Sequence, residues 1–471
     1  MGKTVFISYA HVDQERVHLL ERALCALGLH VTYDRNDVRV GEPISMAIRD
    51  LINKCDIFIV LASVASQKSQ WVIHETGAAY GAHKRIIRYI IDLSVRDNIP
   101  ETLGQIKHVT SFEEIVEYLH KEGDIGPQYG IPGEGIRSEE GIKRFLVVGQ
   151  CCWDTIITDA NERYAHTGGS AYYVSRAMVY AAKHLQSRVA VDVCGHLGED
   201  RAVPIRNSFQ CPAIGLHFTP GTKTLHFENR LVDKEDYARV EQVIKCMADK
   251  AISESFLGEQ LVQRLKQESY EMALLLPLTP RDFGDLAGGF VPFLRTTCPS
   301  LKIGLELHGL TRQVSSYGGP VGNEVSEVLL HLLQGGVIHC AHCTIDEGLL
   351  VVKALAECDG VRCPVNESST GDEIALALCD KGNVDYVGLT DGGRGSWVAW
   401  RKDDASVSVQ AIKTLDLSKL LERPHPTGAG DTWFGIFAYA RFGLNLPPIV
   451  AGVLATGFAT IKCGQKGALG E

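Results

Sequence analysis

The chain has 471 residues, more than one hydrophobic core usually serves, so two or more domains are expected. Its composition, 45% hydrophobic and 22% charged, is ordinary for a soluble globular protein. The formal net charge of −10, with no basic run beneath it, argues against a nucleic-acid partner, because phosphates require a basic face.

The start of the chain and its cysteines indicate a cytoplasmic protein. Residues 1–10 run directly into a strand pattern, so no signal peptide is predicted. No apolar run is long enough to cross a bilayer, so a membrane is not an expected partner. The fourteen cysteines are therefore interpreted as reduced thiols. His339, Cys340, His342 and Cys343 are metal-ligand types, but no second ligand pair stands apart from them. A strand is favoured there, and no metal ligand is predicted.

Strand-like and helix-like runs alternate through residues 1–121. The expected strands are 5–8, 30–33, 57–61 and 86–91, and amphipathic stretches at 17–24 and 44–52 predict helices. Near-continuous apolar strands separated by helices indicate a parallel sheet covered on both faces, as in flavodoxin-like α/β domains. A capping box at Ser111 and Glu114 predicts the last helix of this domain.

A segment rich in glycine and proline at 122–141 predicts a linker, because its composition resists both helix and strand. The alternation of strands and helices resumes after it, beginning with an apolar strand at 145–148. A second α/β domain is therefore expected over residues 142–471.

Candidate ligand-binding segments follow the strands of the first domain, because ligands bind parallel sheets at the carboxyl ends of the strands. These segments are Ser8–Ala10, the loop Asp34–Glu42, and Ala62–Glu75, in which Trp71 and Glu75 share a helix face. Within and beside them, Phe6–Ala10 with the nearby Asp13, Asp34–Gly41 and Trp71-x-x-x-Glu75 resemble, in this order, the opening box, the BB loop and the catalytic segment of NAD-cleaving TIR domains. The resemblance covers the whole first domain.

The TIR resemblance implies that Glu75 is the catalytic residue. An ionised carboxylate beside the ribose stabilises the positive charge that develops when the bond to nicotinamide breaks. The expected NAD+-binding residues are Tyr9, Ala10, Ser69 and Trp71. The alternative is that Glu75 is an exposed residue of an adaptor, which only binds other TIR domains.

A second candidate site lies at Thr427–Asp431, where small residues precede an apolar helix. Such a turn leaves the first backbone N–H groups of the helix free to face an anion, so Gly428, Ala429 and Gly430 are the expected anion hole. Asp431 can act as the catalytic base that accepts a proton from an alcohol attacking a phosphoryl group.

This segment resembles the second signature of PfkB (ribokinase) family carbohydrate kinases. Further segments match in the family's order, including Gly195–Asp200 and Leu307–Arg312, and together they cover about residues 143–471. The resemblance implies a ribokinase-like α/β fold, with a lid within 215–232. It also implies that Asp154, Gly168 and Gly169 bind a sugar or nucleoside and that Thr390, Gly392 and Gly395 bind ATP.

The sequence departs from the family at two places. Tyr173 stands where the family usually has asparagine, and the Asn-x-x-Glu motif that organises Mg²⁺ is not cleanly present, although residues 342–347 are a candidate for its position. Because phosphoryl transfer depends on the metal, a weaker magnesium site threatens rate more than binding. The domain is therefore either an ATP- and Mg²⁺-dependent kinase or a ligand-binding module.

Two hypotheses for the whole chain follow. In the first, it is an NAD+-consuming effector, similar to anti-phage defence proteins, which self-associates through its TIR domain and is controlled by a nucleoside or sugar ligand. In the second, it is a sugar or nucleoside kinase whose TIR domain recruits partners. A third possibility couples the two, with the kinase phosphorylating a ribosyl product of NAD+ cleavage.

Overall fold

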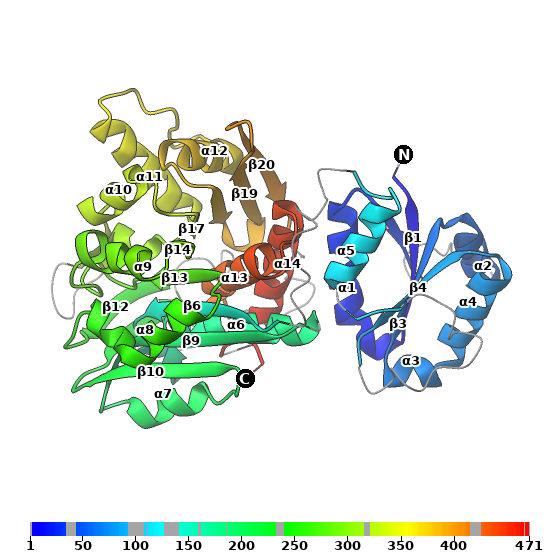
Figure 1. Ribbon diagram of the computed structural model, residues 1–471, viewed down its shortest axis with the longest axis horizontal. Helices are drawn as coiled ribbons and strands as arrows, with labels where there is room; N and C mark the ends of the chain where they lie inside the picture. Colours follow the sequence, from blue (N-terminus) through cyan, green and yellow to red (C-terminus); the bar gives the residue numbers. More distant parts are fainter. Residues whose placement is uncertain are drawn as a thin grey trace. The chain divides into compact units, whose positions relative to one another are not determined.

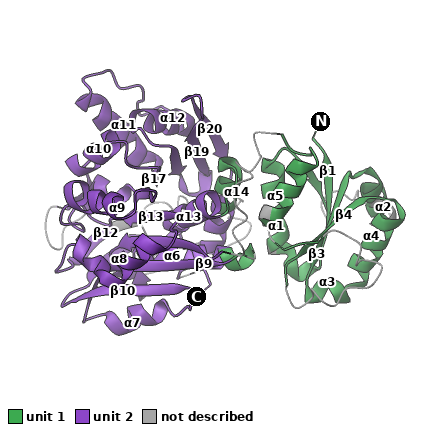
Figure 2. Cartoon of the chain, in the orientation of Figure 1, with its two compact units in different colours: residues 1–139, 182–187, 444–454 green, residues 140–181, 188–443, 455–471 purple. Residues whose placement is uncertain are grey.

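The computed structural model describes the chain in eleven stretches: 2–33, 44–92, 108–110, 112–126, 141–158, 162–185, 187–231, 240–314, 321–414, 425–465 and 467–470. The predicted loop Asp34–Gly41, the predicted capping residue Ser111 and most of the predicted linker lie outside these residues. The chain divides into two compact units (Figure 2): residues 1–139, 182–187 and 444–454, and residues 140–181, 188–443 and 455–471. Among the described helices, none has the length and apolar character needed to cross a bilayer.

The N-terminal sheet has five parallel strands in the order β2-β1-β3-β4-β5 (Figure 1). The strands are β1 (Thr4–Ser8), β2 (His30–Thr32), β3 (Ile57–Ala62), β4 (Arg85–Ile90) and β5 (His108–Val109). The helices are α1 (Gln14–Ala26), α2 (Ile44–Lys54), α3 (Val64–Lys68), α4 (Gln70–Gly81) and α5 (Phe112–Lys121). Figure 1 shows α1 and α5 on one face of this sheet and α2 and α4 on the other.

This sheet confirms the predicted α/β fold of the first part of the chain. All six side chains of β3 are buried, which matches a strand covered on both faces. The rings of Phe6 and Phe58 stack with their centroids 5.5 Å apart on neighbouring strands, among buried residues of α2 and α4. Because the strand order reverses direction at β1, the carboxyl ends of β1 and β3 flank a topological switch point, where ligands of such sheets bind.

The C-terminal unit contains a nine-stranded sheet in the order β10-β9-β6-β13-β14-β17-β18-β19-β20. These strands are β6 (Lys143–Gly149), β9 (Val189–Gly198), β10 (Ile214–Gly221), β13 (Met272–Leu276), β14 (Lys302–Glu306), β17 (Cys340–Thr344), β18 (Tyr386–Thr390), β19 (Ser396–Arg401) and β20 (Val407–Ile412). The pairs from β10 to β18 are parallel, and β19 and β20 extend the sheet antiparallel. The principal helices that lie wholly or partly in this unit are α6 (Ser170–His184), α7 (Ala202–Ser208), α8 (Gly258–Gln267), α9 (Val291–Thr297), α10 (Glu327–Gln334), α11 (Ile345–Cys358), α12 (Gly371–Lys381), α13 (Ala429–Ala438) and α14 (Pro448–Lys462).

A second, four-stranded sheet has the order β12-β11-β7-β8. Its strands are β7 (Cys152–Ile157), β8 (Arg163–Gly168), β11 (Leu225–Leu231) and β12 (Val240–Cys246). Residues from three of these strands line the cavity described in the next subsection, so this sheet forms the cavity's wall. The segment 215–232, where a lid was predicted, contains most of β10, which belongs to the large sheet, and β11, which joins the four-stranded one.

The run that combines histidine and cysteine is β17, as the strand interpretation predicts. Cys340 and Cys343 are fully buried, and His339, just before the strand, accepts a hydrogen bond from the backbone of Ile303 at 3.1 Å. The geometry thus assigns these residues to the core of the large sheet. His342 is the exception, because its ring also lines the cavity.

Candidate functional site

Glu75 lies on the buried face of α4. The helix begins after Ser69, whose hydroxyl accepts a hydrogen bond from the backbone N–H of Val72 at 3.4 Å, so Ser69 is the N-cap. The Glu75 side chain is only 5% exposed, and its Oε2 accepts a hydrogen bond of 2.5 Å from the hydroxyl of Ser8. Since Ser8 is the last residue of β1, the carboxylate reaches the carboxyl end of that strand.

The neighbouring segment is tied to the end of β3. Ala10 accepts a hydrogen bond from the backbone of Asp13 at 2.8 Å, and the buried carboxylate of Asp13 accepts another from the hydroxyl of Ser63 at 2.7 Å. Tyr9 is buried and meets Tyr33 edge-on, with ring centroids 6.0 Å apart. The segments that follow β1 and β3 are therefore joined at the same edge of the sheet as the carboxylate of Glu75.

Trp71 and Glu75 have different surroundings although they are four residues apart on α4. Trp71 is 38% exposed, whereas Glu75 is nearly covered. His74, which was not predicted to be catalytic, is exposed. Because Glu75 is buried, the adaptor alternative loses its premise of an exposed glutamate. The BB loop predicted at Asp34–Gly41 lies outside the described residues.

A cavity of about 260 Å³ lies within the C-terminal unit. It brings together six of the predicted site residues: Asp154, Gly169, Thr390, Gly428, Gly430 and Asp431. The other four predicted residues, Gly168, Ala429, Gly392 and Gly395, do not line it. These six residues come from segments spread over almost 280 positions, and the fold gathers them at one place.

Asp154 lies on β7 and is 4% exposed. Its Oδ1 accepts hydrogen bonds from the Asn229 amide at 3.3 Å and from the Cys152 thiol at 3.4 Å. The diglycine beside it is required for space, because a Cβ at Gly168 would lie 1.9 Å from Asp154 Oδ2. Burial raises the pKa of Asp154, and the charge of His166 opposes that shift. Asp154 is thus positioned to bind a hydroxyl-bearing ligand.

Asp431 lies in the first turn of α13 and is partly exposed. The loop before it turns at Gly428, whose φ of 82° is one that favours glycine. The N–H of Ala429 donates to the carbonyl of Pro426 at 2.9 Å. This N–H group of the predicted anion hole is therefore already hydrogen-bonded within the loop and does not face an anion. Burial raises the pKa of Asp431, whereas the nearby Ser170 side chain and the charge of His342 oppose that rise.

Three further residues of this cavity were not predicted individually, although His308 and His342 lie within the segments 307–312 and 342–347 named above: Glu306, His308 and His342. Glu306 is 2% exposed; its Oε2 lies 2.6 Å from Nδ1 of His342, and its Oε1 lies 3.1 Å from Nδ1 of His308. Burial raises the pKa of Glu306 to about 8 and lowers that of His342 to about 4. Burial thus favours the neutral forms of both side chains, and the two share a short contact inside the cavity wall.

The cavity contains polar groups that the described residues leave without a hydrogen-bond partner. The hydroxyl of Tyr173 and Nε2 of His342 are both buried and have no hydrogen-bond partner among the described residues. Both residues line the cavity. Because an unmade buried hydrogen bond costs about 1–3 kcal/mol, these atoms favour a ligand or water that completes them.

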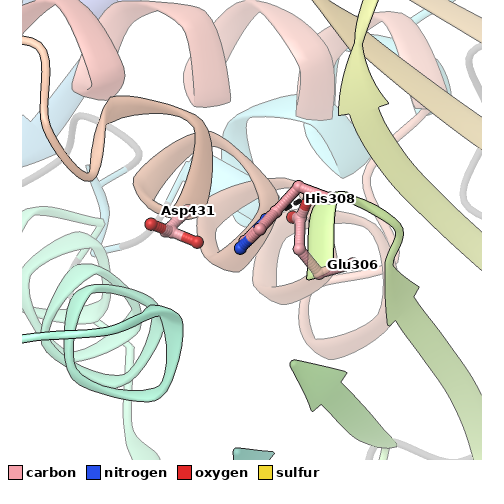
Figure 3. A group of neighbouring side chains, drawn as sticks. All are labelled: Glu306, His308 and Asp431. Carbon is pink, nitrogen blue, oxygen red and sulfur yellow. Dashed lines mark ion pairs between the residues drawn. The ribbon is translucent and has the colours of Figure 1, made fainter. Parts of the chain in front are cut away.

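Glu306, His308 and Asp431 offer ligand atoms within 4.8 Å of one another. Figure 3 shows the imidazole of His308 directed towards Asp431, with its ion pair to Glu306 drawn. A set that includes imidazole suits Zn²⁺ or Mn²⁺ better than Mg²⁺, which prefers oxygen. For Mg²⁺ the fitting donors are the carboxylates of Asp431 and Glu347 and the hydroxyl of Thr344, all in the cavity lining.

Thr344 and Glu347 lie within residues 342–347, the candidate segment for the magnesium motif. They form a capping box at the start of α11, in which Oε2 of Glu347 accepts from the Thr344 N–H at 2.8 Å. Thr344 is the last residue of β17, and Glu347 lies in the first turn of the helix that follows it.

On the predicted nucleotide side, Thr390 ends β18 and is followed by η8 (Gly392–Arg394). Gly392 has a φ of 50°, and Gly395 has a φ of 128° with the backbone of Ile412 close beside it. These glycines therefore shape the turn, and Thr390 is the part of it that reaches the cavity.

Comparisons with known proteins find one kind of domain at the N-terminus and a second fold over most of the chain. The TIR domain family model matches residues 5–120. A sulfate complex of a pyrophosphate-dependent kinase in the ribokinase family is similar over 69% of this chain and 97% of its own, at 15% identity and a TM-score of 0.50. Fructokinase from Vibrio cholerae O395, in a form with fructose, ADP and calcium ion, has 17% identity over 70% of this chain and 95% of its own, at a TM-score of 0.48.

Ribokinase from Giardia lamblia is similar at 13% identity over 69% of this chain and 92% of its own, with a TM-score of 0.46. No curated protein matches the chain. The protein is therefore a fusion of a TIR domain with an α/β domain of the ribokinase fold. Both predicted fold types are confirmed.

Proposed function

We propose that this protein cleaves NAD+ at the bond between nicotinamide and ribose, and that a nucleoside or sugar bound in the cavity of the ribokinase-fold domain controls this reaction. The observation that carries the proposal is the position of Glu75, which is buried on α4 and held by Ser8 at the carboxyl end of β1. A fixed carboxylate at that edge can stabilise positive charge on a bound ribosyl group.

The proposed reaction needs no strong acid. The bond between nicotinamide nitrogen and C1′ of the ribose breaks, and its electron pair leaves with nicotinamide. Water then attacks C1′ and releases a proton, which gives ADP-ribose; an internal nucleophile would give a cyclic product instead. Glu75 stabilises the cationic ribosyl group between these steps, and Tyr9, Ala10, Ser69 and Trp71 remain the proposed NAD+-binding residues.

The proposed control rests on the cavity of the second domain. Asp154 and Asn229 offer hydrogen bonds to ligand hydroxyls, and the Tyr173 hydroxyl is available to complete the set. The N-terminus of α13 favours a negatively charged group beside them. A nucleoside, a sugar or a phosphorylated form of either fits this chemistry. The proposed trigger is self-association of the TIR domains when the ligand binds. The proposed biological role is anti-phage defence.

The test is NAD+ consumption by the full-length protein with and without a panel of nucleosides, sugars, sugar phosphates and nucleotides. Glu75→Ala and Glu75→Gln should reduce turnover about 10²–10³-fold, as loss of a charge-stabilising group does. His74→Ala, an exposed neighbour on the same helix, is the matched control and should keep it. Intact NAD+ in wild-type protein across the whole panel would contradict the proposal.

A second candidate function, ATP-dependent phosphorylation of the cavity's ligand, is favoured by the position of Asp431. It lies in the first turn of α13 and lines the cavity, a position from which a carboxylate can take the proton of an attacking hydroxyl. When bound, Mg²⁺ would neutralise the phosphates, and Glu347 and Asp431 are its proposed ligands.

Asp431→Asn tests that function. It should abolish phosphorylation of every accepted compound while NAD+ turnover persists. If wild-type protein phosphorylates none of the nucleosides and sugars, the domain acts as a ligand sensor.

A further inference from the structure

Lys462, the last residue of α14, places an ammonium group inside the ribokinase-fold domain. The residue is 0% exposed. Its Nζ donates to the carbonyl of His425 at 3.0 Å and to the carbonyl of Gln465 at 3.1 Å. It also lies 5.5 Å from the centroid of the Tyr173 ring, within the range of a cation–π interaction. An ammonium is seldom buried this deeply unless such partners replace its water.

Lys462 binds the segment that leads into the candidate anion hole. His425 lies three positions before Gly428, and its own N–H donates to the carbonyl of Cys463 at 2.7 Å. The segment is thus fastened at both backbone groups of His425 to the end of α14. Two residues of one short stretch, Lys462 and Cys463, make these bonds.

Tyr173 holds the same loop from another side. A Cβ at Gly428 would lie 2.4 Å from the Tyr173 ring, so the ring packs directly on the glycine backbone. Lys462 contacts this ring as well as the His425 carbonyl. Tyr173 and Lys462 therefore contact each other and together hold loop 425–428 in place.

We propose that Lys462 is a positioning residue whose ammonium holds loop 425–428, and with it the N-terminus of α13, in the conformation that binds a phosphate group. The inference rests on the proposed function of the cavity as a site for a nucleoside or sugar and its phosphorylated form. The ammonium has two consequences for that site. It fixes a glycine-containing loop that would otherwise sample many conformations, and it places a positive charge beside a segment that receives an anion.

The test uses inorganic pyrophosphate as the probe and isothermal titration calorimetry of the full chain. Lys462→Ala should bind pyrophosphate at least tenfold more weakly than wild type. Methylammonium chloride should restore most of that affinity in Lys462→Ala, because the small cation can enter the space left by the side chain and bind the same two carbonyls. Tetramethylammonium chloride at equal concentration controls for ionic strength and should not restore it, because it has no N–H group to donate.

Two further variants make the result specific. Lys266→Ala removes an exposed lysine from the last turn of α8 and should leave pyrophosphate affinity unchanged. Lys462→Met keeps the length and bulk of the side chain without its charge, and it should lose affinity without rescue by methylammonium. If both Lys462 variants fail to fold, the proposal is wrong, because the residue is then part of the domain's core.

The outcomes also separate this inference from the proposed function. If wild-type protein binds no pyrophosphate, the proposed phosphate-binding cavity is wrong, and the role of Lys462 falls with it. If wild type binds and folded Lys462→Ala binds equally well, only the role of Lys462 is overturned. A weakened Lys462→Ala that methylammonium does not rescue overturns it too, since a general loss of packing would then explain the result.

Discussion

The hydroxyl of Ser8 donates a hydrogen bond of 2.5 Å to the carboxylate of Glu75, across 67 positions of the chain. Both residues are buried, and the bond joins the end of β1 to the middle of α4. This contact ties the candidate catalytic carboxylate to the end of β1. Hydrogen bonds to charged groups are worth about 1.5–3 kcal/mol, so removing it should be measurable.

Ser8→Ala should therefore lower NAD+ turnover by roughly 10- to 100-fold, which corresponds to that range of energy. The loss should appear in kcat more than in KM, because the contact positions the carboxylate rather than NAD+. His74→Ala again provides the control on α4. Unchanged kcat in Ser8→Ala would mean that Glu75 does not depend on this contact.

Gly428→Ala should abolish anion binding by the ribokinase-fold domain. The residue has a φ of 82°, which strains any side chain, and its new Cβ would meet the Tyr173 ring at 2.4 Å. Gly284→Ala is the matched control, because its Cβ would have no described neighbour closer than 3.8 Å. Pyrophosphate titration compares the two variants, and equal affinity would contradict the assignment of the loop.

Tyr173→Phe should separate stability from binding. The hydroxyl that it removes is buried and has no hydrogen-bond partner among the described residues. Since leaving such a group unsatisfied costs about 1–3 kcal/mol, the variant should be as stable as wild type or more stable. Thermal unfolding with and without the sugar and nucleoside panel measures both properties. If Tyr173→Phe unfolds at a lower temperature than wild type and ligands stabilise both proteins equally, the hydroxyl contributes to folding and not to ligand binding.

The pair of Glu306 and His342 predicts how stability depends on pH. Burial raises the pKa of Glu306 from 4.5 to about 8, so its contribution is full below pH 4.5 and is lost as pH rises through 8. Burial lowers the pKa of His342 from 6.5 to about 4, so stability rises with pH over that interval and then stays constant. Of these two side chains, only Glu306 still titrates above pH 6.5.

The free energy of unfolding should accordingly fall by about 2 kcal/mol between pH 6.5 and pH 8, at 1.36 kcal/mol for each pKa unit. Glu306→Gln should remove this decline, because its amide does not titrate. Urea denaturation followed by circular dichroism at several pH values tests the difference between the two proteins. Parallel curves would mean that Glu306 is already ionised at pH 6.5.

The sequence predicts the strands and the motif residues because those signals are local. The six apolar residues of β3 are consecutive, and the segment Thr427–Asp431 is contiguous, so neither depends on the rest of the fold. The burial of Glu75 relative to Trp71 is different. Helical spacing puts both on one side of α4, but which row packs on the sheet depends on the position of the whole helix.

The group of Glu306, His308 and His342 could not be predicted from sequence. Glu306 and His342 are register partners on the parallel strands β14 and β17, and 36 positions separate them. Strand register is set by the whole sheet. Lys462 gives no sequence signal either, because its partners are backbone carbonyls, which every residue possesses.

Trp433 stacks on the imidazole of His342, with ring centroids 5.2 Å apart and planes within 19°. A charged imidazole quenches the light emission of a neighbouring indole far more strongly than a neutral one. The fluorescence of Trp433 should therefore respond to the protonation of His342 in the cavity wall, and a bound compound that engages His342 should change it. The protein thus carries its own optical reporter of cavity occupancy, and Trp433→Phe identifies that signal among the five tryptophans.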